Sequence, residues 1–251
     1  MKKLGLTLVM AMMAVMLVAG GAWAIPFGDG GAALQGVLDN HTVGGPSSVD
    51  VTTDALSDQT DSYWSVEASG GALATMIIEL AGFAPGNTFG IFDMADHSKT
   101  VQLFAGANDQ GDKTLLSIYA DGSIEVNFFD TGIDFASNAF GFYLNSSMYT
   151  NGGFWYSDTS LNSDQTDHLA VYQGVGDQFQ ILPYAAGVWG SNEYVLAFED
   201  LTSAASDFDY TDMVVMVESV NPVPEPGTMA LLGIGLLGLA FVGRKKLKIK
   251  E

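Results

Sequence analysis

Between residues 62 and 199, apolar residues come in short alternating runs and do not follow helical spacing. Alternation over about four to eight positions puts apolar side chains on one face of a β-strand, whereas a helix repeats them about every 3.6 residues. The clearest runs are S-Y-W-S-V-E-A (62–68), T-V-Q-L-F-A (100–105), L-S-I-Y-A (116–120), S-I-E-V-N-F-F (123–129), F-G-F-Y-L (140–144), H-L-A-V-Y (168–172) and Y-V-L-A-F-E (194–199). Turn-forming Gly and Asp residues separate these runs, so we predict an all-β fold, an antiparallel β-sandwich.

Three other stretches refine this prediction. Asp121-Gly122 lies between two runs and predicts a hairpin, because Gly accepts the positive φ of a tight turn. The stretch 73–81 has the length of a buried strand or a short helix, and its flanking glycines favour a strand. Residues 25–61 are dominated by Gly, Asp, Ser and Thr, which predicts a looser region with one or two edge strands.

The charges are segregated along the chain. Seven of the nine basic residues lie near the two ends, whereas only two of the 29 acids, Glu225 and Glu251, lie beyond residue 222. Residues 25–222 therefore hold Lys99 and Lys113 against 27 acids, a formal charge of −25. Phosphate binding depends on clustered Lys and Arg, so we predict no nucleic-acid partner. The absence of Cys excludes disulfides and thiolate metal sites.

The N-terminal segment has the three-part layout of a secretory signal peptide. Two lysines precede an uncharged apolar stretch, and the small-residue triplet A-W-A ends at Ala24. We therefore predict a signal peptide over residues 1–24, cut by signal peptidase after Ala24, with an acidic β-sandwich domain over 25–221. The alternative is an uncleaved membrane anchor.

The C-terminal segment predicts a membrane anchor. A linker at 222–226 holds Pro224, Glu225 and Pro226, and the 17 apolar residues 227–243 follow it. At about 1.5 Å per residue this helix spans roughly 26 Å, enough for a thin bilayer. The basic tail 244–251 should remain cytoplasmic, which leaves the acidic domain outside.

Pro-Glu-Pro, a glycine-rich apolar segment and a basic tail, in this order, resemble the PEP-CTERM sorting signal of bacterial surface and exopolysaccharide-associated proteins. The resemblance implies that an exosortase, a membrane-embedded cysteine transpeptidase, cuts at or near Pro224, Glu225 and Pro226. It also implies an inner-membrane anchor before processing, and a cell-surface or extracellular-matrix location afterwards. The alternative is a plain single-span tail anchor.

Catalytic motifs are absent from the sequence. The three His residues form no H-E-x-x-H pair, and neither a G-x-S-x-G elbow nor a phosphate-binding glycine loop occurs. A glycosidase needs only two carboxylates beside a cleft, and such a pair cannot be located among so many acids. We therefore predict that the protein is not an enzyme.

Two acid-rich loops are candidates for a calcium site. The stretch 198–215 places Asp207, Asp209 and Asp212 at spacings of two and three, with Glu199 or Asp200 at the end of the preceding strand. Calcium prefers about six to eight oxygen ligands, which carboxylates, carbonyls and hydroxyls can supply. The loop before 168 adds Asp164 and Asp167 as candidate ligands. The alternative is that these side chains cap turns in solvent.

The same stretch resembles a bacterial extracellular domain family of uncharacterised function. The residues that carry the resemblance are F-E-D-L at 198–201, S-D-F-D-Y-T-D at 206–212 and the apolar strand that follows. It covers about 138–219, and members usually have Asn where this chain has Thr211. The resemblance implies a β-rich surface domain, often with a PEP-CTERM tail, and no reaction.

Aromatic residues beside glycines suggest a second function. Trp155 in G-G-F-W-Y-S and Trp189 in G-V-W-G could be exposed as flat platforms for sugar rings. The alternative is that they belong to the core. The sequence thus predicts an exported, non-enzymatic β-sandwich that calcium stabilises, with a matrix-polysaccharide binding module as the second hypothesis.

Overall fold

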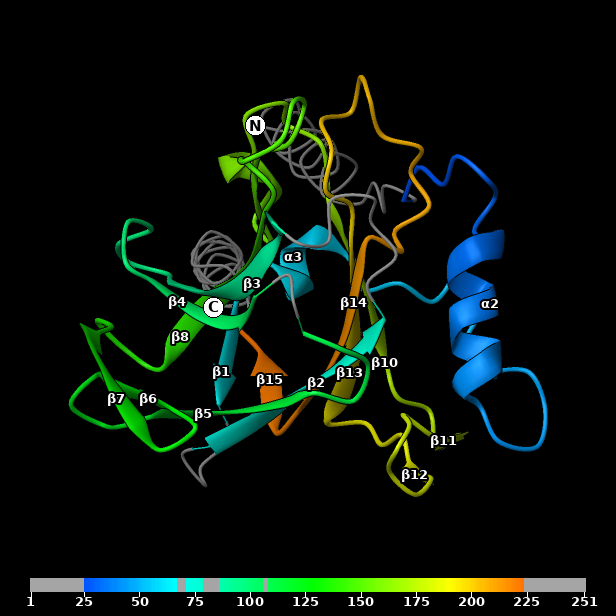
Figure 1. Cartoon of the computed structure of the whole chain (residues 1–251), viewed down its shortest axis with the longest axis horizontal. Helices are drawn as coiled ribbons and strands as arrows, with labels where there is room; N and C mark the ends of the chain where they lie inside the picture. The colour runs from blue at the N-terminus through cyan, green and yellow to red at the C-terminus, as the bar shows by residue number, and fades with distance from the viewer. Residues whose placement is uncertain (1–24, 67–70, 79–85, 106–107, 224–251) are drawn as a thin grey trace, which may run out of the picture.

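The computed structural model describes residues 25–66, 71–78, 86–105 and 108–223 (Figure 1). The predicted signal peptide with Ala24, the Pro224–Pro226 motif, the apolar segment 227–243 and the basic tail 244–251 lie outside the described residues. Among the residues that are described, no helix is long and apolar enough to cross a membrane.

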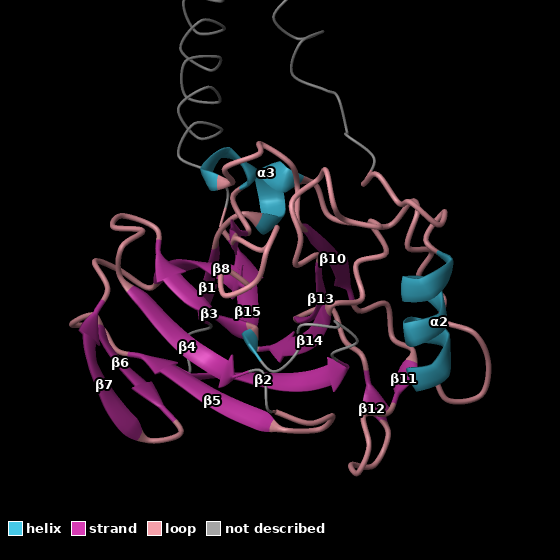
Figure 2. Cartoon of the chain, turned by 45° about the horizontal axis from the view of Figure 1, so that its top comes forward, coloured by secondary structure: helices cyan, strands magenta, loops and turns pink. Residues whose placement is uncertain are grey.

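Within the described residues the chain forms two large antiparallel sheets and one small one (Figure 2). The first sheet has the order β15 (Val220–Pro222), β1 (Trp64–Val66), β8 (Ala139–Asn145), β3 (Thr88–Asp93) and β4 (Thr100–Ala105), with β9 (Phe154–Tyr156) also paired to β8. The second sheet has the order β10 (Leu169–Gln173), β13 (Glu193–Phe198), β14 (Met213–Glu218), β2 (Gly71–Ile78), β5 (Lys113–Ile118), β6 (Ser123–Val126) and β7 (Phe129–Asp134). The small sheet is a hairpin of β11 (Gln178–Phe179) and β12 (Gly187–Val188).

The main hydrophobic core lies between the two large sheets. Trp64 and Phe142 of the first sheet belong to the same buried cluster as Leu196 and Val215 of the second. Alternate residues of strands such as β3, β10, β13 and β14 point into this cluster, because side chains of a strand face opposite sides in turn. The alternating runs in the sequence therefore encode two facing antiparallel sheets, as predicted.

Each of the seven alternating runs contains a strand of the structure. The Asp121-Gly122 hairpin is confirmed: Gly122 has φ 93°, and its N–H donates to the carbonyl of Tyr119 between β5 and β6. The ambiguous stretch at 73–81 is a strand over its described part, since β2 runs from Gly71 to Ile78, and positions 79–81 lie outside the described residues.

Loops and turns make up most of residues 25–61, as predicted, but the predicted edge strands are wrong: the region forms two helices and a single isolated bridge residue, Thr42. Helix α2 (Ala32–His41) packs Leu34, Val37 and Leu38 against the outer face of the second sheet, and the short α3 (Asp58–Asp61) follows. Those three apolar residues have i, i+3, i+4 spacing, which puts them on one helix face. The surrounding polar residues obscured this short pattern.

The outer face of the second sheet is also covered. Helix α2 and the β11–β12 hairpin cover one side of the second sheet, where Tyr172, Trp189 and Tyr210 are buried (Figure 1). Strand β15 pairs with β1 at an edge of the first sheet, and its last residue, Pro222, begins the predicted linker. Pro is tolerated there because an edge strand leaves one row of backbone groups without partners.

Candidate metal centre

The acid-rich loop joins two central strands of the second sheet. Strand β13 ends at Phe198 and β14 begins at Met213, and these two residues are paired across the ladder. The loop from 199 to 212 thus starts and ends at the same end of these two paired strands. Two non-glycine residues in it, Phe208 and Tyr210, have φ of 54° and 55°. Such left-handed residues are costly and curl the chain tightly around Asp209.

Burial of Tyr210 holds this curl in place. Its side chain is fully buried, its ring meets that of Phe27 edge-on at 5.3 Å, and its hydroxyl donates to the carbonyl of Asp167 at 2.9 Å. The conformation of the loop is therefore fixed by the core beneath it.

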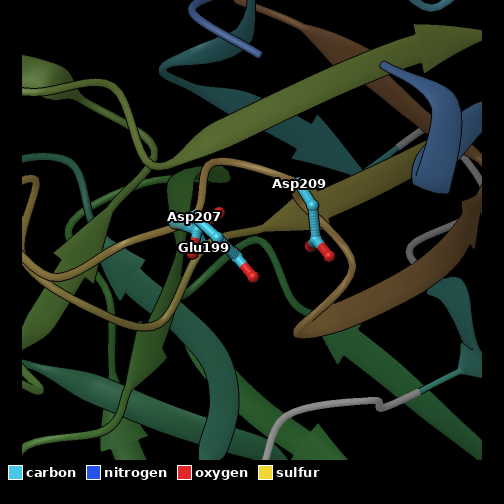
Figure 3. A group of neighbouring side chains, drawn as sticks. All are labelled: Glu199, Asp207 and Asp209. Carbon is cyan, nitrogen blue, oxygen red and sulfur yellow. The ribbon is translucent and has the colours of Figure 1, made fainter. Parts of the chain in front are cut away.

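Three carboxylates converge in this loop. Glu199, Asp207 and Asp209 each place one oxygen within 4.8 Å of the others (Figure 3). Glu199 is buried, Asp209 is half-buried and Asp207 is exposed. The group opens to solvent on one side, and such an arrangement of oxygens can hold a hard divalent cation.

Two further acids lie directly behind the three carboxylates. The N–H of Asp200 donates to the carboxylate of Asp212 at 2.9 Å, and the amide Nδ2 of Asn87 donates to the carboxylate of Asp200 at 3.0 Å. Burial and, to a smaller extent, the charges of Asp200 and Glu199 together raise the pKa of Asp212 to about 9. Asp212 is therefore protonated at neutral pH and acts as a neutral bridge between its neighbours.

The cluster carries more negative charge than its surroundings neutralise. Burial is also the main reason that the pKa values of Glu199 and Asp200 are raised, and the charge of Asp207 adds to both. Among the described residues the one ion pair joins His168 to Asp164, so no Lys or Arg pairs with the cluster.

One buried polar atom beside the cluster lacks a partner. Asn87 is 0% exposed, and its Oδ1 accepts no hydrogen bond although its Nδ2 binds Asp200. Leaving a buried acceptor unpaired costs about 1–3 kcal/mol. An amide oxygen at this position is also a typical calcium ligand.

A stacked pair of rings fixes the backbone beneath the cluster. Trp155 and His168 lie parallel with centroids 3.8 Å apart. The indole N–H of Trp155 donates to the carbonyl of Asp200 at 2.8 Å, and Nδ1 of His168 lies 3.2 Å from the carbonyl of Glu199. The two acids at the start of the loop are thus anchored through their main chains.

Asp164 and Asp167, two of the predicted ligands, have other partners. The carboxylate of Asp164 lies 3.2 Å from Nε2 of His168 and accepts the N–H of Ser203 at 2.9 Å. Asp167 accepts the N–H of Leu169 at 3.0 Å. Neither belongs to the three-carboxylate group, although both lie on the loop that packs beside it.

The turn-capping alternative also describes part of the site. Asp209 accepts the N–H of Thr211 at 2.8 Å and its hydroxyl at 2.7 Å through one carboxylate oxygen. A single Asp can thus shape the turn and face the cluster. The sequence missed Asn87 as a member of the site, since nothing near position 87 signals that it meets a loop more than a hundred residues away.

The predicted sugar platform is wrong. Trp155 and Trp189 are both 0% exposed, and the N–H of Trp189 donates to the carbonyl of Glu193 at 3.1 Å. A Cβ on Gly153 would collide with Trp155, and one on Gly174 would collide with Trp189. The neighbouring glycines therefore allow close packing against the indoles and do not expose them.

Two known protein families match parts of the chain. A PEP-CTERM protein-sorting motif covers residues 222–246, which marks an exported protein that exosortase sorts. A domain of unknown function (DUF4114) covers residues 83–220, so its match extends further toward the N-terminus than the predicted 138–219. Neither a curated protein nor a solved structure matches the chain. The second match spans more than half of the sequence and includes the whole candidate metal centre, so the chain belongs to the DUF4114 family.

Proposed function

We propose that the protein is an exported, non-enzymatic surface or extracellular-matrix component whose DUF4114 domain binds calcium through Glu199, Asp207 and Asp209. The convergence of these three oxygens within 4.8 Å carries the proposal. Calcium is preferred over magnesium because the carboxylates sit on a curled, partly exposed loop, whereas magnesium demands a near-ideal octahedron and keeps most of its water.

The electrostatics of the site support a bound cation. Carboxylates that are buried without basic partners must take up protons or bind a cation, and the raised pKa values of Glu199 and Asp200 indicate this. The Oδ1 of Asn87 is a buried oxygen that also lacks a partner. A divalent ion would satisfy the acids together and fix the loop between β13 and β14. Its role would be to stabilise the domain outside the cell.

Thermal unfolding of the purified protein in calcium, magnesium and chelator tests the site. A ligand that binds only the folded state at about a hundred times its Kd adds about 2.7 kcal/mol, which raises Tm by several degrees. The variant with Asp207→Asn and Asp209→Asn should lose this response.

The matched control carries Asp96→Asn and Asp121→Asn. Each of these exposed acids accepts hydrogen bonds from a serine two residues later, as Asp209 does from Thr211, but lies outside the cluster. The control should keep the full calcium response. Equal stabilisation by magnesium, or an unchanged response in the Asp207/Asp209 variant, would show that these acids only form turns.

Sorting is tested separately by the mass of the intact protein recovered from the cell surface. We expect a mature chain that starts at Ile25, after signal peptidase has acted, and that lacks the segment after about Pro226. Replacing Pro224 and Pro226 with Ala should retain the protein in the inner membrane. Full-length chains with the basic tail at the surface would contradict exosortase processing.

A further inference from the structure

A cavity of about 110 Å³ lies at the end of β13 and β14 that is opposite to the acidic loop. Its floor includes Glu193, Met216 and Glu218 from these two strands and Lys113 from the start of β5. The β11–β12 hairpin supplies the other side, including Tyr184 and Trp189. The cavity is distinct from the candidate metal centre and shares no residue with it.

Two carboxylates lie side by side on the cavity floor. Glu193 and Glu218 are directly paired across the β13–β14 ladder, so both side chains point to the same face. Glu193 accepts the N–H of Gly190 at 2.6 Å. Neither carboxylate takes part in the ion pair found among the described residues, and the charge of Lys113, which lines the same cavity, acts on Glu218.

The wall of the cavity already holds an ammonium group. Nζ of Lys113 lies 3.7 Å from the ring centroid of Tyr184, which is a cation–π contact. Tyr184 is 41% exposed, and Val188, which also lines the cavity, is exposed as well. The rim is therefore apolar and accessible, although the floor is acidic.

The charges on the floor repel one another. Burial is the main reason that the pKa of Glu218 is raised, and the charge of Glu193 raises it further, against the opposing effect of Lys113. A second cation placed between the two carboxylates would relieve this repulsion.

We propose that this cavity binds a primary ammonium group, with Glu193 and Glu218 as its acceptors and the ring of Tyr184 as its wall. Two carboxylates beside an aromatic and apolar lining suit an ammonium on a carbon stem. They supply too few oxygens for calcium, which prefers about six to eight. The ammonium can belong to an amino sugar of a polysaccharide or to a lysine side chain of a protein.

Calorimetric titration of the purified protein in chelator separates these two sources. The probes are a glucosamine oligomer, its fully N-acetylated counterpart and a short lysine-containing peptide with a blocked N-terminus. We expect the free amine of at least one source to bind and the acetylated oligomer to bind at least tenfold more weakly. Binding of the glucosamine oligomer alone identifies a saccharide, and binding of the peptide alone identifies a protein partner.

Variants test the residues named in the proposal. Glu193→Gln with Glu218→Gln should weaken ammonium binding at least tenfold. Lys113→Met should strengthen it several-fold, because the internal ammonium no longer competes for the site. Glu125→Gln is the matched control, since Glu125 is a carboxylate beside an aromatic residue, accepting the hydroxyl of Tyr119 at 2.8 Å, and lies outside the cavity.

Four results would overturn the proposal. Equal binding of the acetylated and free oligomers would show that the amine is not recognised. If Glu125→Gln weakened ammonium binding as much as the Glu193/Glu218 variant does, binding would reflect general attraction to an acidic protein and not this cavity. Weaker binding by Lys113→Met would make this lysine a ligand-binding group and not a competitor. Absence of binding by every amine at millimolar concentration would leave the cavity without this function.

Discussion

The two ends of the β13–β14 pair carry the same type of side chain in different surroundings. At one end, Glu199 and Asp212 flank a curled loop in which carboxylates face one another without a basic residue. At the other end, Glu193 and Glu218 share a cavity with a lysine and an aromatic ring. Oxygens that converge on a point suit a small hard ion, whereas two carboxylates beside a ring suit an organic cation.

Each end is anchored by a buried tryptophan. The indole of Trp155 donates to the carbonyl of Asp200, and that of Trp189 donates to the carbonyl of Glu193. Each carbonyl also accepts a second hydrogen bond, from the hydroxyl of Ser146 at Asp200 and from the N–H of Gly174 at Glu193. The two proposed cation sites therefore lie above similar main-chain supports, and they differ in the side chains that surround the carboxylates.

The largest effect is expected when either support is removed. Trp155→Ala and Trp189→Ala should each lower the free energy of unfolding by about 3–5 kcal/mol, because each deletes a fully buried indole. Chemical denaturation measures both losses. A loss below about 1 kcal/mol at one end would show that the two supports are not equivalent.

A milder substitution separates the two ends by function. Trp155→Phe and Trp189→Phe keep an aromatic ring but remove one hydrogen bond, which contributes about 0.5–1.5 kcal/mol. We expect Trp155→Phe to weaken the calcium-dependent rise in Tm and to leave ammonium binding intact, and Trp189→Phe to do the reverse. If either variant impairs both responses, the two ends are coupled.

The pH dependence of stability tests the loop that holds Asp164 and Asp167, beside the proposed calcium site. Burial raises the pKa of Asp167 above 3.8, and the charge of Asp58 raises it further, so the fold favours the protonated form. The stabilisation from this residue is present below about pH 4 and is lost as pH rises through the folded-state pKa. Asp167→Asn, which mimics the protonated acid, should therefore gain stability over the parent at pH 8 and gain nothing at pH 3, as measured by denaturation at both pH values.

Asp164 provides the control of opposite sign on the same loop. Burial alone would raise its pKa, but the N–H groups of Ser203 and Thr166 and the neighbouring His168 together lower it. Its stabilisation is present above about pH 4 and is lost as pH falls through the lowered pKa. Asp164→Asn should cost about 1 kcal/mol at pH 8 and less at pH 3, measured by denaturation at both pH values. Equal effects of the two Asn variants at pH 8 would contradict these assignments.

The smallest effect is expected from repulsion among the acids of the whole domain, which surrounds both ends of the strand pair. Residues 25–222 carry a formal charge of −25, so monovalent salt at a few tenths molar should raise Tm slightly as the Debye length falls below roughly 8 Å. The parent and the Asp207/Asp209 variant should respond alike in chelator, because surface repulsion is common to both. A Tm that falls as salt rises would count against a role for surface repulsion.

Local sequence patterns predicted about half of the described strands but not the contacts that support them. Alternation identified seven strands, and Asp121-Gly122 identified a hairpin, because both signals depend on neighbouring residues. The helix at 32–41 was missed because its apolar face consists of only three residues among polar ones. A face this small is recognised only when the sheet that it covers is known.

The candidate sites show the same division between local and distant information. Asp207 and Asp209 were predicted from their spacing within one loop, and the structure brings them together with Glu199. Asn87, the Trp155–His168 stack and the Glu193–Glu218 pair depend on contacts between distant segments or on strand register. A single sequence carries no direct signal of these contacts.

The pairing of β15 with β1 sets the position at which the sorting enzyme can work. Main-chain hydrogen bonds hold the chain as far as Val223, whose N–H donates to the carbonyl of Tyr63 at 2.7 Å, and Pro224 follows immediately. A protease that takes its substrate as an extended strand cannot engage residues that are already part of a sheet. An exosortase that cuts at the Pro224–Pro226 motif would therefore act beyond the sheet, and the released domain would keep β15.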